Sequence, residues 1–288
     1  MMNGSKKGGD FSENKNLSVD FFENKKAQVT VFIIIAVVIV AVTALFFVLR
    51  GSLDVLKSPD EIFLDQQVNI IRERVDDCVY QSAQKVIFIN SLQGGYYEPA
   101  QDSFRLSLDD DETIFFVPKY INFDQNKILS RTALENQFSL GVKKEVQNCF
   151  DFSDLPIEII YDLDNAKFTS LLSKNSIRVQ ADLPITLTSN LSSQRINNFE
   201  ITLDSKYLQM YLLATKLTEQ QYSNREYFCV SCVTDESFKS GFDISTEETQ
   251  DSSSETVLYS ILYYDDSKNI SEIYLFAHRL KLLDGGEL

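Results

Sequence analysis

The sequence predicts an α+β fold, with an apolar N-terminal transmembrane helix followed by long amphipathic helices packed on an antiparallel β-sheet. Residues 29–49 form an uninterrupted run without a charged side chain. Stretches that begin near residues 59 and 130 repeat apolar residues every three or four positions, which is the helical period. From residue 156 onward, short β-prone runs are separated by turn residues, as expected for an antiparallel sheet.

The composition excludes several classes of protein. The chain has 288 residues and a formal net charge of −15, which argues against nucleic acid as a partner because phosphate binding needs clustered Lys and Arg. The 44% of hydrophobic residues can form a sizeable core and excludes a wholly disordered chain. His278 is the single histidine, which disfavours histidine-rich metal sites and most histidine-based catalysis. We therefore expect no metal and no cofactor.

Residues 29–49 are predicted to cross a lipid bilayer once. Thr30 and Thr43 are the only polar side chains in the run. A helix of this length reaches about 31 Å, which matches a hydrocarbon core of about 30 Å. The alternative is a helix buried in the core of a soluble protein. The sequence thus predicts a polar cytoplasmic head or cleavable leader over 1–27, a transmembrane helix over 28–50, and an extracytoplasmic α+β domain over 51–288.

The orientation follows from charge. Lys25 and Lys26 directly precede the run, and cytoplasmic flanks are enriched in Lys and Arg. Arg50 and Lys57 give an equal count on the other side, so the preference rests mainly on the acidic remainder of the chain, which suits the outside. We expect a single-pass protein of the cell membrane with its N-terminus in the cytoplasm and its C-terminal domain outside.

The junction from Lys25 to Phe32, read KKAQVTVF, resembles the class III signal sequence of archaeal type IV pilin-like proteins. The resemblance implies that a prepilin peptidase cuts between Ala27 and Gln28 and that other envelope proteins are partners. Assembly-competent pilins usually carry Glu five residues into the mature chain, whereas this chain has Phe32, which argues against filament incorporation. An ordinary uncleaved signal anchor is the alternative. The segment from Cys78 to Pro99 resembles uncharacterised membrane-anchored proteins of small-genome archaea, and this resemblance supplies a family but no established activity.

The first helix of the outer body is predicted to begin at Pro59. Ser58 would be its N-cap, and Glu61 would complete a capping box. Gly94 and Gly95 would end it about 35 residues later. Its apolar face is formed by Leu64, Val68, Ile71, Val75, Cys78, Val79, Ala83, Val86, Ile87 and Leu92.

The remaining elements follow from shorter signals. Residues 104–108 and 113–117 predict a hairpin around the acidic run 109–112, for which a Ca²⁺ site is the alternative to a solvated turn. Ser130 and Ser205 are predicted to begin two further helices. Other expected strands are 157–161, 168–172, 177–183, 185–188, 199–203, 227–233, 257–264 and 270–278. Residues 243–255 are predicted to be an exposed loop.

The four cysteines are predicted to form structural disulfides. Cys78 and Cys149 lie on two predicted helices, and a bridge between them would stabilise by about 4 kcal/mol in the chain-entropy model. Cys229 and Cys232 have the spacing of a redox motif or a zinc half-site, but they lie in the β-prone run 227–233. Connectivity cannot be deduced from sequence. Free buried thiols and metal or redox chemistry remain the alternatives.

Few other motifs point to chemistry. Asn190 and Asn269 begin glycosylation sequons in predicted loops. Metalloprotease, serine hydrolase, phosphate-loop and dinucleotide-binding motifs are missing from the sequence. His278 is interpreted as a surface or strand-end residue. We therefore do not expect an enzyme.

Three functions are compatible with these features. The first is a membrane-anchored, pilin-like surface protein whose non-catalytic outer domain makes envelope or cell-surface contacts. The second is a ligand-binding or sensory ectodomain, whose pocket would be lined by aromatic residues such as Tyr96, Tyr97, Tyr207 and Tyr211. The third is a membrane-tethered thiol oxidoreductase that uses the CxxC pair. Cys229 at an exposed helix start would favour the third, and a buried strand disulfide would exclude it.

Overall fold

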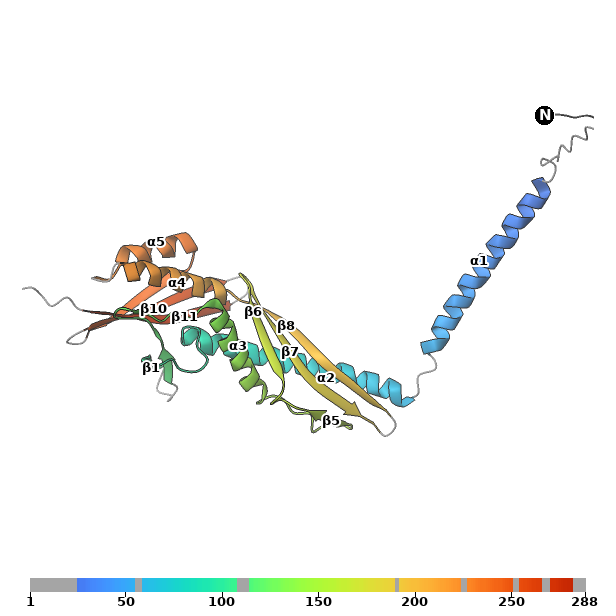
Figure 1. Cartoon of the computed structure of the whole chain (residues 1–288), viewed down its shortest axis with the longest axis horizontal. Coiled ribbons are helices and arrows are strands. Elements are labelled where there is room, and N and C mark those ends of the chain that lie inside the picture. Colours follow the sequence, from blue (N-terminus) through green and yellow to red (C-terminus); the bar gives the residue numbers. More distant parts are fainter. Residues whose placement is uncertain are drawn as a thin grey trace, which may run out of the picture. The chain divides into compact units, whose positions relative to one another are not determined.

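The computed structural model describes residues 25–54, 59–107, 114–189, 192–223, 227–250, 254–265 and 270–281. The chain divides into two units, Met1–Ser58 and Pro59–Leu288. The first contains one helix, α1 (Lys25–Asp54), shown in Figure 1. The second combines helices with β-sheets, which confirms the predicted α+β class.

The structure corrects the prediction of a membrane-spanning segment. Among the described residues, no helix combines the length and the apolar character that crossing a bilayer requires. The predicted transmembrane helix, the single-pass topology and the cell-membrane localisation are therefore wrong on this finding.

The longest helix of the second unit, α2 (Pro59–Leu92), is the one predicted from Pro59. The predicted apolar face is its buried face, with Ile71, Val75 and Val86 fully covered. Its end is also as predicted, because Gly94 and Gly95 adopt positive φ angles of 53° and 88° that favour glycine. The predicted N-cap residue lies outside the described residues.

The second long helix, α3 (Arg131–Val146), packs against α2, and the Ser130 hydroxyl caps it by accepting a hydrogen bond from the Ala133 amide at 3.2 Å. Gly141 permits the close approach of the two helices. A Cβ atom at this position would lie 2.6 Å from Tyr97 Cδ2 and 2.8 Å from Val86 Cγ1.

We expect Gly141→Ala to destabilise the protein. Alanine gains about 1 kcal/mol in helix propensity, but a methyl group forced into a packed interface typically costs about 1–3 kcal/mol. Equilibrium urea unfolding should therefore show a net loss of up to about 2 kcal/mol. Asn136→Ala on the exposed side of α3 is the matched control, and it should be neutral or stabilising. A more stable Gly141→Ala variant would show that the helices do not pack this closely.

One antiparallel sheet is centred on β7 (Ser176–Thr188). The strand pairs along one edge with β8 (Ser193–Asp204), whereas β6 (Lys167–Leu172) and β5 (Glu158–Tyr161) share its other edge. β7 joins two predicted strands, because the chain continues past Pro184 with a register shift between Asp182 and Ile185.

A second sheet has the strand order β4-β3-β11-β10-β9. Its strands are β3 (Lys119–Asn122), β4 (Gln125–Asn126), β9 (Asp243–Gln250), β10 (Ser254–Asp265) and β11 (Ile270–Lys281). β3 runs parallel to β11 while the other pairs are antiparallel, so this sheet is mixed and the antiparallel prediction holds only in part. The predicted hairpin is present as β1 (Phe104–Ser107) and β2 (Ile114–Val117). The acidic run 109–112 lies outside the described residues.

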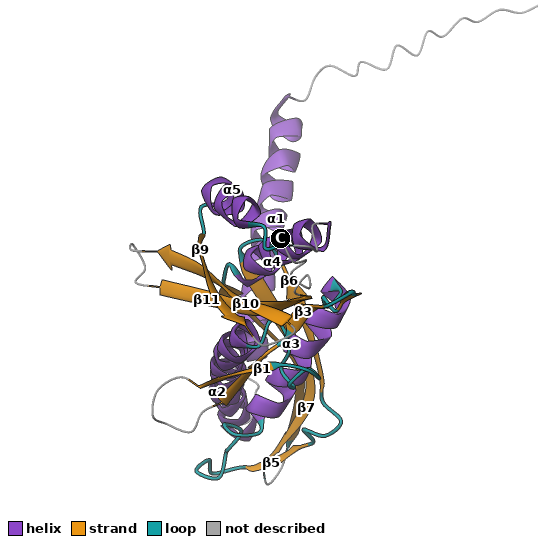
Figure 2. Cartoon of the chain, turned by 90° about the vertical axis from the view of Figure 1, so that its left-hand side faces the viewer, coloured by secondary structure: helices purple, strands orange, loops and turns teal. Residues whose placement is uncertain are grey.

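Helices cover both faces of the second sheet, with α4 (Tyr207–Ser223) and α5 (Val230–Ser240) on one face and α2 on the other (Figures 1 and 2). The start of α4 follows Ser205, the residue predicted to begin it, and the Tyr207 amide donates to the Ser205 hydroxyl at 3.0 Å. Two predictions were wrong. The expected strand 227–233 is the start of α5, and the expected loop 243–255 contains β9.

Candidate functional site

The structure joins the four cysteines in two pairs, Cys78 with Cys149 and Cys229 with Cys232. The first pair links α2 to the residues that follow α3, with the Cα atoms 5.7 Å apart across 71 sequence positions. In the chain-entropy model, closing a loop of this length stabilises by about 4.4 kcal/mol, whereas the short loop of the second pair contributes only about 2 kcal/mol. The first bridge therefore has the larger structural role.

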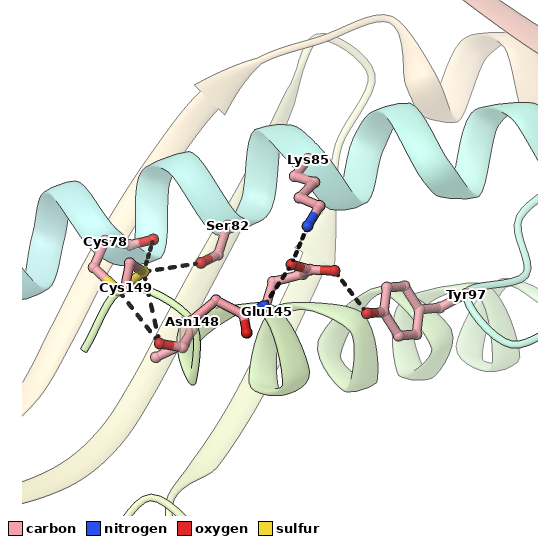
Figure 3. A network of polar contacts seen from close by, with 8 residues as sticks. Cys78, Ser82, Lys85, Tyr97, Glu145, Asn148 and Cys149 are labelled. Carbon is pink, nitrogen blue, oxygen red and sulfur yellow. Dashed lines mark hydrogen bonds and ion pairs between the residues drawn. A yellow bond between two sulfur atoms is a disulfide. The ribbon is translucent and has the colours of Figure 1, made fainter. Parts of the chain in front are cut away.

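A polar network lies next to the first bridge, between α2 and α3 (Figure 3). The buried Glu145 carboxylate accepts hydrogen bonds from Tyr97 at 2.9 Å and from Asn148 at 3.1 Å, and it pairs with the Lys85 ammonium at 2.7 Å. Burial alone would raise the pKa of Glu145, but the hydrogen bonds from Lys85 and Tyr97 outweigh burial and lower the pKa. Both oxygens of the Glu145 carboxylate have partners. We therefore interpret this cluster as a structural link that holds α2 and α3 together.

The second cysteine pair lies at the start of α5, not in a strand. Cys229 is the N-cap residue, and Cys232 lies in the first turn. The Cys229 side chain is 8% exposed, whereas Cys232 is only half-buried. The first turn of α5 holds no acidic residue, and the N-cap side chain makes no capping hydrogen bond. Cys229 therefore lies at a helix start, which favours thiol chemistry, but it is buried and not exposed as that prediction required.

Buried polar groups from α4 hold this turn in place. Gln221 donates to the Tyr227 carbonyl at 2.9 Å and accepts from the Cys229 amide at 3.0 Å. One turn beyond Cys232, the buried Glu236 carboxylate pairs with Lys216 at 2.6 Å. The hydrogen bond from Lys216 is the main reason that the pKa of Glu236 lies below its usual value.

A groove of about 750 Å³ lies between α2 and the two sheets. Its walls carry aromatic side chains that are unusually exposed for their size: Tyr80 at 41%, Phe88 at 53% and Tyr264 at 58%. Ile87 and Ile273, both partly exposed, add aliphatic surface. A concave site with such a lining is the usual form of a binding site.

The groove follows strand edges. Thr202, Leu203 and Asp204 are consecutive residues of β8 and line it together. Because consecutive strand residues point to opposite faces, all three can border one groove only along the edge of the strand. Within the described part of the chain β8 pairs with β7 alone, and β11 pairs with β3 only from Ala277 onward. Edges of β8 and β11 therefore border the groove without a neighbouring strand.

The acidic character of the groove comes from two of its lining residues, Asp204 and Glu272. Glu272 is fixed at the start of α4, where it accepts from the Ser205 hydroxyl at 2.6 Å and from the Lys206 amide at 3.0 Å. Among the described residues that line the groove there is no Lys or Arg. The groove therefore suits a ligand that is apolar and positively charged.

The four tyrosines predicted to line a ligand pocket do not line this groove. Tyr207 and Tyr211 are buried in the core, and the Tyr211 hydroxyl donates to the Leu129 carbonyl. Tyr96 donates to the Lys127 carbonyl, and Tyr97 contacts Glu145. Burial, together with the hydrogen bond to Glu145, raises the pKa of Tyr97 to about 12. Sequence reasoning missed Tyr80, Phe88 and Tyr264. Tyr80 and Phe88 could have been noticed as aromatic residues outside the apolar face predicted for the helix that begins at Pro59.

His278 is a core residue and not the surface residue that was expected. Its side chain is fully buried in β11, with Nε2 2.9 Å from the Thr218 hydroxyl and Nδ1 3.0 Å from the Tyr259 hydroxyl. Burial lowers the pKa of His278 to about 3. The imidazole is therefore neutral at physiological pH.

Several predicted sites cannot be placed. Asn190 and Asn269, the two sequon asparagines, lie outside the described residues. Ala27 and Gln28 lie within α1, and their side chains are outside the description, so processing there stays a prediction. Among the described residues, no group of three or more His, Cys, Asp or Glu side chains is arranged to hold a metal ion.

Comparison with known proteins gives no further assignment. No protein-family model, no curated protein and no solved structure matches this chain.

Proposed function

We propose that residues 59–288 form a non-catalytic binding domain that holds an extended segment of a partner polypeptide in the groove between α2, β8 and β11. The observation that carries the proposal is the coincidence, in one groove, of exposed aromatic residues and strand edges that have no neighbouring strand in the described part of the chain. The sequence analysis expected a role in interactions, and the proposal assigns that role to one surface and to one type of ligand.

The strand edges favour an extended peptide over a compact small molecule. A strand edge offers backbone N–H and C=O groups that an added strand can pair with, and pockets beside the edge select alternate side chains. Tyr80 and Phe88 on α2 and Tyr264 on β10 provide apolar surface beside those edges. An extended ligand with apolar residues at every second position would use both features.

Charge favours a basic ligand. Asp204 and Glu272 are the charged residues among the described residues that line the groove, and the whole chain carries a net charge of −15. Electrostatic complementarity raises association rates and disfavours wrong partners. We therefore expect Lys or Arg at the remaining positions of the bound segment.

Selection of random decapeptides from a display library on the full chain tests the proposal. We expect enrichment of peptides with alternating apolar side chains and at least one Lys or Arg. Proline substituted at alternate positions should abolish binding, because it removes the backbone N–H groups that pair with the edge. Phe88→Glu and Tyr264→Ser, from opposite walls, should each weaken binding of the selected peptides at least tenfold.

Phe238→Glu is the matched control, since Phe238 is 91% exposed on α5 and does not line the groove. It should bind the selected peptides as the unmodified chain does. Circular dichroism should show that all three variants are folded. The proposal fails if no peptide is enriched, or if both groove variants bind the enriched peptides unchanged.

A further inference from the structure

We infer that Cys229 and Cys232 form a redox-active pair that exchanges its disulfide with a dithiol exposed on another polypeptide. The inference rests on the placement of the pair at the start of α5, on the unequal exposure of the two cysteines and on the short loop that the bridge closes. It involves residues that do not line the groove, so it stands independently of the proposed peptide binding.

Unequal exposure assigns different roles to the two sulfur atoms. Cys232 is half-buried and can be reached by an incoming thiolate, whereas Cys229 is 8% exposed. Thiol–disulfide exchange requires that the nucleophile reach one sulfur while the other leaves. Cys232 is therefore the sulfur that is attacked, and Cys229 is the leaving group.

The helix start stabilises the leaving thiolate. The first amide groups of a helix lack intrahelical acceptors and carry partial positive charge, so an anion at the N-cap is favoured. Cys229 occupies this position in α5, and no acidic residue in the first turn opposes a negative charge there. Cysteines in such positions have lowered pKa values and leave faster. The Ser231 hydroxyl, 3.7 Å from the Cys229 sulfur, is a further hydrogen-bond donor.

The exchange balances without another reagent. A thiolate of the partner attacks the Cys232 sulfur, the Cys229–Cys232 bond breaks, and a mixed disulfide forms while Cys229 leaves as a thiolate. The partner's second thiol then attacks its own sulfur in the mixed disulfide and releases Cys232. The partner dithiol is oxidised to a disulfide, and the pair takes up two electrons and two protons as two thiols.

The surroundings favour a polypeptide as the source of the dithiol. Tyr227 and Val230, which flank Cys229 in sequence, are 64% and 61% exposed. Exposed apolar side chains beside a reactive group provide contact area for another protein. Gln221 meanwhile holds the Cys229 backbone from α4, so the turn stays in place when the bridge opens.

Limited reduction of the full chain tests the inference. A synthetic peptide with two cysteines, in reduced form, is mixed with the protein, and thiols are alkylated at intervals and mapped by mass spectrometry. We expect the Cys229–Cys232 bridge to open at least 100-fold faster than the Cys78–Cys149 bridge, with one peptide disulfide formed per pair. Circular dichroism should show that the fold is retained.

Single-cysteine variants test the two roles. With the oxidised peptide, Cys229→Ser should form a mixed disulfide through Cys232, and Cys232→Ser should do so at least tenfold more slowly because Cys229 is buried. The helix-start effect is tested by Ser231→Asp, which places a negative charge in the first turn. In the reduced protein it should slow alkylation of Cys229 at pH 6.5 about threefold, whereas the neutral Ser231→Asn should not.

Three results would overturn the inference. The first is equal resistance of both bridges to the peptide. The second is unfolding of the domain when only the Cys229–Cys232 bridge is reduced, which would show that the bridge is structural. The third is the same alkylation rate in Ser231→Asp and Ser231→Asn. None of these results depends on whether the groove binds peptides, so the two proposals fail separately.

Discussion

Replacing Cys78 and Cys149 together by alanine is expected to lower the free energy of unfolding by about 4 kcal/mol. The bridge spans 71 positions and joins α2 to the end of α3, so its loss restores a large amount of chain entropy to the unfolded state. Such a loss is a large part of the stability of an ordinary domain. It is the largest effect that we expect from removing a covalent feature of this chain.

Equilibrium urea unfolding of the full chain, followed by circular dichroism, measures this loss. The control is Cys229→Ala with Cys232→Ala, whose short loop predicts a loss of only about 2 kcal/mol. A larger loss in the control than in the Cys78–Cys149 variant would contradict the loop-length argument. A loss below about 1 kcal/mol in the Cys78–Cys149 variant would show that the bridge does not constrain the unfolded chain.

Local signals in the sequence predicted the helices that pack most strongly. The face of α2 was predictable because its apolar residues recur with the helical period and its end carries two glycines. Ser130 and Ser205 likewise mark the starts of α3 and α4 by side-chain capping. These features depend on neighbouring residues alone, so the sequence contains them.

The start of α5 was not predictable from β-propensity. Tyr227, Phe228 and Val230 favour strands, but packing on α4 and the Lys216–Glu236 pair outweigh that preference. The polar strand β9 was missed for a related reason. Its side chains are mostly exposed, so backbone pairing with β10 holds it and no apolar alternation marks it. Long-range contacts decided both segments.

The groove was beyond sequence reasoning for the same reason. Tyr80 and Phe88 lie on α2, and Tyr264 lies almost 180 positions further along the chain. Only the relative placement of two sheets and a helix brings them together. The tyrosines chosen instead lie close to glycines and helix starts. The hydroxyl groups of Tyr96 and Tyr211 donate to backbone carbonyls, and that of Tyr97 donates to Glu145.

Replacing His278 by glutamine is expected to remove a strong pH dependence of stability. The Thr218 hydroxyl donates its proton to the Ala214 carbonyl at 2.7 Å, so it can only accept from Nε2 of His278. Nδ1 then accepts from the Tyr259 hydroxyl. A second proton on this ring would place a charge in the core, and this burial is why the pKa falls to about 3.

The sign of the effect follows from linkage. Because the unfolded histidine has a pKa of about 6.5 and the folded one a pKa of about 3, the unfolded state binds more protons between these values. The contribution of His278 to the free energy of unfolding is therefore fully present above about pH 6.5, and it is lost as the pH falls towards 3. One histidine should contribute a loss of about 2 kcal/mol between pH 7 and pH 5, and roughly 4 kcal/mol by pH 3.

Urea unfolding of the unmodified chain and of His278→Gln at pH 7 and pH 5 measures the difference. Most carboxylates stay ionised over this range, and the chain has no other histidine, so the difference between the two proteins isolates the contribution of His278. Thr218→Val, which removes the hydroxyl beside Nε2, is the matched control. It should lower stability at both pH values and retain the pH dependence, because the imidazole remains buried. An unchanged pH dependence in His278→Gln would mean that His278 already binds a proton in the folded protein.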